Sequence, residues 1–86
     1  MPRICEFRGI VITMQFEDHA PPHFHARYEE FEALIRIDSA EVSEGWLPIR
    51  VQRLVTTWTR AHREELAENW LRARRRLSLK RIEPLR

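Results

Sequence analysis

The 86-residue sequence has one cysteine, two glycines and no long apolar run. Its single cysteine, Cys5, excludes an internal disulfide and therefore the disulfide-stapled class of small secreted domains. No stretch of 18 apolar residues and no cleavable leader pattern is present, so membrane spanning and secretion both lose support. We therefore expect a cytoplasmic protein that has no contact with membranes.

Several familiar catalytic signatures are also missing. The chain has no Ser-His-Asp order, no glycine-rich phosphate loop and no CxxC pair, so the corresponding nucleophilic, nucleotide-binding and redox chemistries lose support. With 43% apolar and 33% charged residues and no low-complexity segment, the chain reads as one globular domain over residues 1–86. We divide it into a strand region at 1–47, a helical region at 48–76 and a C-terminal tail at 77–86.

Alternation of apolar and polar residues predicts strands in the first region. Ile10, Ile12, Met14 and Phe16 alternate with Val11, Thr13 and Gln15, so the even positions are expected to face the core. Gly9 divides residues 3–16 into a hairpin or a bulged strand pair. Further strands are predicted at 23–28, at 31–37 and, for a short fifth strand, near Val42.

The period changes after Pro48, where apolar residues recur at helical spacing. One helix over 48–76 would be about 43 Å long at 1.5 Å per residue, whereas a domain of this length is only about 31 Å across. Two helices with a break between Arg60 and Arg63 are therefore predicted, followed by a tail that docks its Leu and Ile on the core. The fold class is α+β: a small antiparallel meander of four to five strands with two C-terminal helices packed on one face.

The net charge of +2 hides a strong asymmetry. Residues 1–47 contain four arginines against nine acidic residues, a net charge of −5, whereas residues 48–86 contain eleven basic residues against four glutamates, a net charge of +7. This favours an acidic partner for the second half, either nucleic acid or a protein, although the two halves could instead pair with each other. The candidate phosphate- or partner-binding residues are Arg36, Arg72, Arg74, Arg75 and Arg76, with Lys80 and Arg81 extending the basic run.

A histidine cluster is the main candidate site. Parity places His23, His25 and Arg27 on the open face of the sheet, and Asp18 and His19 enter from the preceding proline-rich turn. Three interpretations remain open. His19, His23 and His25, with Asp18, would suit zinc. The same histidines with Arg27 or Arg36 would suit metal-independent acid–base cleavage of a phosphodiester. The third is a structural role, with turn hydrogen bonds and an exposed His25.

Longer motifs carry a family resemblance. The segment Asp18-His19-x-Pro21-Pro22-His23-Phe24-His25-Ala26-x-Tyr28, with Gly9–Ile12, Leu47-Pro48, His62–Leu66, Asn69-Trp70 and Ile82–Leu85, resembles the small bacterial proteins grouped as domain of unknown function 4160. The resemblance runs over essentially the whole chain. It differs from the family pattern at Glu29, where a glycine is usual, and in the richer arginine run at 72–76. The resemblance implies no established activity; it implies a small partner protein of the 2442 unknown-function group, in a toxin–antitoxin-like pair.

From the residues and the resemblance together, we expect a toxin-like or accessory module of a two-protein system, with nucleic-acid contact through the basic half. The alternatives are a metal-independent endoribonuclease and a zinc-binding structural domain. Whether the chain is an enzyme and whether it forms a homo-oligomer stay open. No cofactor is expected unless the zinc interpretation holds.

Overall fold

The computed structural model describes residues 2–86, and its sheet follows the order of the sequence. The strands β1 (Arg3–Phe7), β2 (Ile10–Thr13), β3 (His23–Tyr28), β4 (Phe31–Arg36) and β5 (Val42–Gly45) pair with their sequence neighbours, all antiparallel. The helices α1 (Ile49–Ala61) and α2 (Arg63–Arg74) follow. The predicted α+β meander with two C-terminal helices is confirmed, including the short fifth strand.

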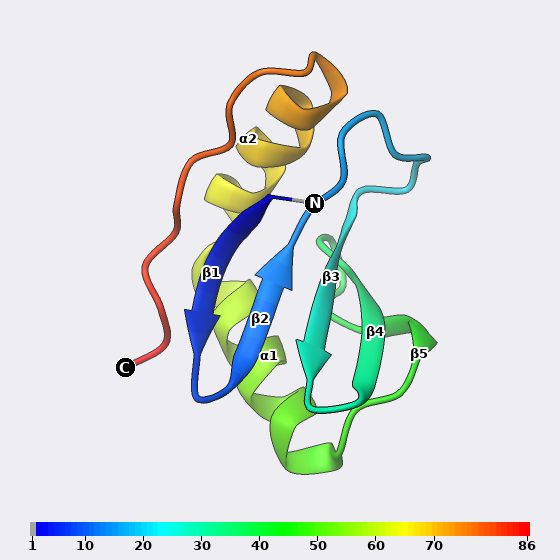
Figure 1. Ribbon diagram of the computed structural model, residues 1–86, viewed down its shortest axis with the longest axis vertical. Coiled ribbons are helices and arrows are strands. Elements are labelled where there is room, and N and C mark those ends of the chain that lie inside the picture. Colours follow the sequence, from blue (N-terminus) through cyan, green and yellow to red (C-terminus); the bar gives the residue numbers. More distant parts are fainter. Residues whose placement is uncertain (1) are drawn as a thin grey trace.

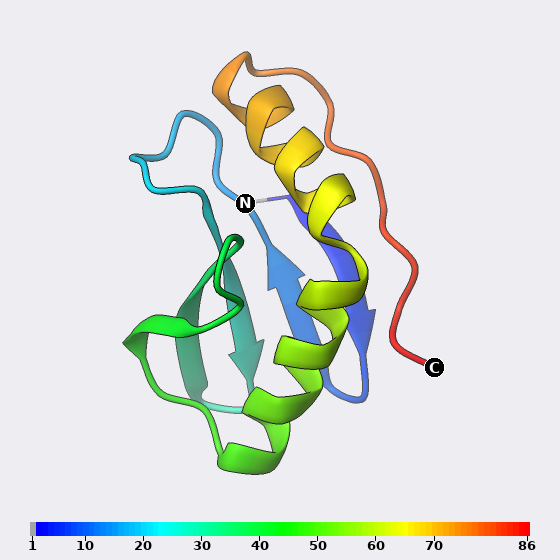
Figure 2. The ribbon, with the colours of Figure 1, turned by 180° about the vertical axis from the view of Figure 1, so that it is seen from behind.

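Both helices lie on one face of the sheet, and none of the described helices or strands covers the other face (Figures 1 and 2). The core fills the space between the sheet and the helices. Cys5 packs in it with 1% exposure, and burial raises the pKa of its thiol. Leu54 and Tyr28 are half-buried against it. The core side chains with less than 2% exposure include Ile4, Ile10, Ile12, Met14, Phe24, Ile35, Leu47, Val55, Trp58 and Leu66.

The helical region breaks at His62, within the predicted interval. The molecule measures 33 Å along its longest axis, which is shorter than one continuous helix over this region would be. At the break, the His62 backbone N–H donates to the carbonyl groups of Trp58 and Thr59 at 3.1 and 3.2 Å, and the residue leaves helical geometry with φ −123°. Within residues 2–86, neither helix has the length and apolar character needed to cross a membrane.

The tail runs beside β1 and is anchored to the core (Figure 1). Ile82 is 4% exposed, and its N–H donates to the carbonyl of Ile4 at 2.9 Å. The indole N–H of Trp58 donates to the carbonyl of Glu83 at 2.8 Å. The predicted docking of the tail is thus confirmed, and it covers the outer edge of the first strand.

One expected core residue, Phe16, is wrongly placed by the alternation pattern. Met14 is fully buried as predicted, but Phe16 is 40% exposed. The strand ends at Thr13, and by Glu17 the chain has turned, with a φ of +53°. The N–H of Glu17 donates to the carbonyl of Ala73 at the end of α2, at 3.2 Å. Met14 is therefore the last residue that follows the alternation, two residues before Phe16. Beyond it the chain leaves the sheet to reach α2.

Candidate functional site

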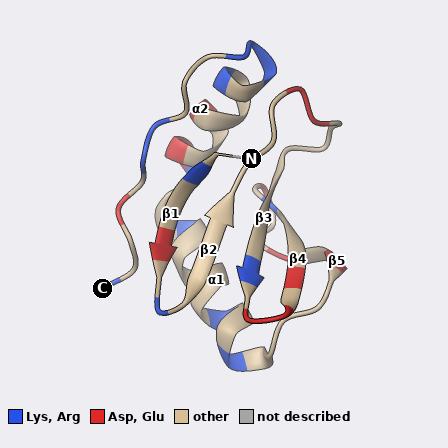
Figure 3. Cartoon of the chain, viewed as in Figure 1, with Lys and Arg blue, Asp and Glu red and all other residues tan. Residues whose placement is uncertain are grey.

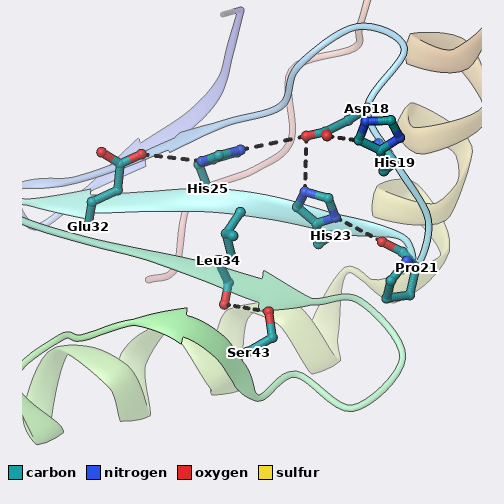
Figure 4. A network of polar contacts seen from close by, with 8 residues as sticks. All are labelled: Asp18, His19, Pro21, His23, His25, Glu32, Leu34 and Ser43. Atoms are coloured by element: carbon teal, nitrogen blue, oxygen red, sulfur yellow. Dashed lines mark hydrogen bonds and ion pairs between the residues drawn. The ribbon is translucent and has the colours of Figure 1, made fainter.

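Strand β3 sets the position of two histidines. His23 and His25 alternate with the buried residues Phe24 and Ala26, so both side chains leave β3 on the side opposite these two core residues, as parity predicts. The turn at residues 16–22 then folds back over this end of the strand and brings Asp18 beside both rings (Figure 4). The strand and the turn together assemble a site that neither segment contains alone.

Asp18 is the centre of the polar network. Its Oδ1 accepts a hydrogen bond from the backbone N–H of His19 at 2.8 Å. Its Oδ2 lies 3.0 Å from Nε2 of His23 and 3.8 Å from Nε2 of His25 (Figure 4). Burial raises the pKa of Asp18, but the His19 N–H and the charged forms of the two imidazoles lower it by more, so the pKa is below its ordinary value. The site therefore favours a charged carboxylate.

The far sides of both rings are held by oxygen acceptors. Nδ1 of His23 donates to the carbonyl of Pro21 at 2.8 Å, and Nδ1 of His25 lies 3.2 Å from Oε2 of Glu32. The three central side chains are only 13 to 16% exposed. His25 is thus largely enclosed, contrary to the interpretation of it as an exposed sheet residue.

A shallow hollow of about 430 Å³ opens beside this network. It is lined by the histidine turn, by His23 and His25, and by Leu34 and Arg36 of β4, among others. The Arg36 guanidinium forms two hydrogen bonds to Asp38, at 3.0 and 2.7 Å, and holds the pKa of that carboxyl below its usual value. Arg36 therefore borders the site but is already paired.

The match to a family model decides which family the chain belongs to. The model called "Domain of unknown function (DUF4160)" matches residues 9–71, well over half of the chain. The chain belongs to this family. No curated protein and no solved structure matches it.

The DUF4160 match includes the histidine turn, β3 and β4 but stops at residue 71, so the resemblance of Ile82–Leu85 falls outside it. At Glu29, the departure from the usual glycine leaves the hairpin intact: Tyr28 still pairs with Phe31, and Glu29 adopts a φ of +54°. This is the left-handed region, which glycine occupies without cost. The backbone therefore keeps a conformation suited to the glycine that this chain lacks.

The side chains of two expected members of the site, His19 and Arg27, are not part of the converging group. His19 is exposed on the turn and contributes its backbone N–H, whereas the three ligand-type groups that converge within 4.8 Å are Asp18, His23 and His25. Arg27 is exposed and, together with Arg3, His25 and Glu32, lines a second hollow of about 300 Å³. The structure thus brings together three of the four residues predicted to bind a metal.

Glu32 is a site residue that the sequence analysis missed. It lies on β4 diagonally across from His25, whose direct partner is Leu34. Arg36 and Glu32 lie four residues apart on β4, so alternation places both side chains on the same face of the sheet. The signal was therefore present in the alternation of β4.

The basic segment at residues 72–81 forms the end of α2 and the start of the tail, outside the region that the DUF4160 model matches. Basic residues gather there in Figure 3. Three of them have partners within the chain: Arg72 donates to the carbonyl of Ser78, Arg76 pairs with Glu17, and Lys80 pairs with Glu68. The other three, Arg74, Arg75 and Arg81, are exposed and form no ion pair with any of residues 2–86.

Arg74 connects the basic segment to the histidine turn. Its guanidinium lies over the ring of Trp70, 6.0 Å from the centroid, and the Trp70 ring is 5.3 Å from that of His23. A hollow of about 410 Å³ lies between Arg74 and the turn at Glu17–Ala20. The basic end of α2 and the histidine site are therefore neighbours on the folded chain.

Proposed function

We propose that the chain is an accessory or toxin-like module of a two-protein system and that it contacts nucleic acid through the basic segment. The main support for the nucleic-acid contact is how few ion pairs join the acidic half to the basic half. Across residues 2–86, a single ion pair, Arg76–Glu17, joins the acidic half to the basic half. Mutual neutralisation therefore accounts for little of the asymmetry, and the positive charge of the second half is available to an outside partner.

Phosphate is the partner chemistry that this surface suits. Arginine guanidinium groups bind phosphate oxygens through paired N–H donors, and exposed cations release counterions from a nucleic acid on binding. Arg74 and Arg75 lie next to each other at the end of α2, and Arg81 follows on the tail. The two-protein role rests on the family resemblance, which implies a small partner of the 2442 group.

A charge-matched comparison tests the nucleic-acid contact. We would measure binding of fluorescein-labelled single-stranded RNA and DNA at several salt concentrations for the wild type, for Arg74→Gln/Arg75→Gln and for Arg50→Gln/Arg53→Gln. The second pair removes the same charge from exposed positions in the first turns of α1, remote from the basic segment. We expect weaker binding only in the first variant, with a salt slope shallower by about 0.7 per lost contact.

Equal loss in the two variants would contradict the proposal, because it would reduce the binding to overall charge. Absence of binding in the wild type would contradict it as well. If the variant at 74 and 75 instead lost affinity for a purified partner protein of the 2442 group while no nucleic acid bound, the basic segment would be a protein interface.

The geometry gives less support to metal-independent cleavage by the histidines. Both Nε2 atoms face Asp18, and Nε2 of His25 has no solvent-exposed area. A general acid or base must reach the proton that it transfers. Neither ring turns a nitrogen toward a phosphodiester bound at the surface.

A further inference from the structure

We propose that Asp18, His23 and His25 bind one divalent transition-metal ion of the zinc class, through Oδ2 of Asp18 and Nε2 of each histidine. This inference is independent of the nucleic-acid contact. It rests on the convergence of three ligand atoms and on where the protons of the two imidazoles must lie.

The three ligand atoms already have nearly the spacing of a metal site. They lie within 4.8 Å of one another, and the two distances from Asp18 Oδ2 are 3.0 Å and 3.8 Å. Ligands that bind zinc tetrahedrally at about 2.1 Å are separated by about 3.4 Å. Small side-chain movements would therefore bring all three atoms to bonding distance of one ion, without any change in the backbone of β3.

The proton on His23 is fixed by Pro21. A carbonyl oxygen only accepts hydrogen bonds, so Nδ1 of His23, 2.8 Å away, must carry the proton. In the neutral ring, Nε2 then carries a lone pair, and this lone pair faces the Asp18 carboxylate at 3.0 Å. Two acceptors at this distance need a proton or a cation between them.

His25 has the same arrangement with a carboxylate in place of the carbonyl. Its Nδ1 is 3.2 Å from Glu32 Oε2, and a carboxylate draws the proton to that nitrogen. Nε2 is left as a lone pair that is shielded from water and has no hydrogen-bond partner among residues 2–86. Buried polar atoms in native proteins nearly always have a partner, so an orphaned nitrogen pointing at a carboxylate calls for an explanation.

Hydrogen bonds within the cluster do not satisfy this arrangement. The two rings lie side by side around the single Asp18 carboxylate, with ring centroids 5.8 Å apart. Nε2 of His25 is 3.8 Å from Asp18 Oδ2, beyond hydrogen-bonding distance. One metal ion would satisfy both lone pairs and the carboxylate at once.

The outer contacts match those that hold metal-binding histidines elsewhere. Such histidines usually donate their second N–H to a carbonyl or a carboxylate, which fixes the ring and the tautomer. Pro21 and Glu32 supply these two acceptors. Two nitrogen ligands and one oxygen ligand favour zinc and similar transition metals over magnesium or calcium. Three protein ligands also leave a coordination position for water or a substrate, as in catalytic rather than structural zinc sites.

Direct metal titration tests the inference. Protein purified without chelators, then stripped, would be titrated with Zn²⁺ by calorimetry and with Co²⁺ by visible absorption. We expect one ion per chain for the wild type, and loss of binding in Asp18→Asn and His25→Gln. Glu32 is a positioning residue, so Glu32→Gln should bind about 10- to 100-fold more weakly while giving the same Co²⁺ spectrum.

His62 provides a matched control. Its Nδ1 is 2.6 Å from Glu65, so it is also a histidine paired with a carboxylate, but it belongs to no group of three ligands among the described residues. His62→Gln should bind metal like the wild type. The inference is overturned if the wild type binds no Zn²⁺ or Co²⁺, or if His25→Gln binds as well as His62→Gln.

A second measurement covers variants that fail to fold. Nitrogen-15 spectra of the wild-type imidazoles report the tautomer directly. We expect a proton on Nδ1 and a bare Nε2 in the neutral form of both His23 and His25, with both Nε2 signals shifting when Zn²⁺ is added. A proton found on Nε2 of the two rings, with no change on adding Zn²⁺, would overturn the inference.

Discussion

The hydrogen bonds between Asn69 and the tail lead to a quantitative prediction. Asn69 is 1% exposed within α2, and its amide nitrogen donates to the carbonyl of Lys80 while its oxygen accepts from the Lys80 N–H, both at 2.9 Å. Asn69→Leu keeps the volume of the side chain but removes both bonds. Because each bond contributes about 0.5–1.5 kcal/mol net, the free energy that holds the tail on α2 should fall by about 1–3 kcal/mol.

Two assays follow this loss separately. Urea unfolding monitored by the fluorescence of the buried tryptophans gives the global stability. Trypsin cleavage after Lys80 and Arg81 reports how often the tail opens, because cleavage tracks the population of the open form when opening is fast. A loss of about 1–3 kcal/mol corresponds to cleavage that is about 5- to 150-fold faster.

Glu68→Gln is the control, since it acts on the same lysine from the neighbouring position. It removes the ion pair to Lys80 Nζ at 2.8 Å, whose side chains are 50 and 63% exposed. Exposed pairs of this kind contribute little to stability, because water and salt screen them. If Asn69→Leu and Glu68→Gln had the same small effect in both assays, the reasoning that a buried amide holds the tail would be refuted.

Three further predictions concern turns and a surface charge. Gly45→Ala should unfold at a much lower temperature than Gly9→Ala. Both glycines have a positive φ, but a Cβ at Gly45 would lie 2.2 Å from a backbone oxygen, whereas a Cβ at Gly9 would meet only a side chain, at 3.5 Å. Equal melting temperatures of the two variants would contradict this. Glu29→Gly should raise the free energy of unfolding by about 1 kcal/mol, because it relieves a left-handed φ of +54°. Thermal or urea unfolding measures this change, and a variant less stable than the wild type would contradict the prediction. Hydrogen bonding and charge from Lys80 lower the pKa of Glu68, so this pair stabilises the fold above the ordinary carboxyl pKa and the contribution is lost as the pH falls through the lowered value. In an NMR titration, Lys80→Gln should raise the pKa of Glu68 toward 4.5, and an unchanged pKa would exclude the ion pair in solution.

Much of the fold could be predicted because it is local. Each strand pairs with its neighbour in sequence, so period-2 alternation located the meander without any long-range information. The helix break followed from a comparison of lengths. Phe16 was misplaced because alternation does not show where a strand stops; the exit depends on the bond between Glu17 and Ala73, which lie far apart in the sequence.

The candidate site was predictable to the extent that it lies on a strand. Parity placed His23 and His25 together, and the same rule would have found Glu32. His19 was grouped with them because it is close in sequence, but in a turn the backbone dihedrals decide where a side chain points, and no periodicity encodes them. The role of Asn69 could not be foreseen either, because its partner is the backbone of the tail.

The docked tail also has a consequence for the order in which the molecule is completed during synthesis. Ile82 and Glu83 contact Ile4 and Trp58, so they leave the ribosome after every residue that they hold. The sheet and both helices can pair and pack earlier, because their contacts lie closer in sequence. The outer edge of β1 therefore stays uncovered until residues 82 and 83 have been made. An unpaired strand edge is a template for association with other chains, so the nascent protein is vulnerable along β1 during that interval.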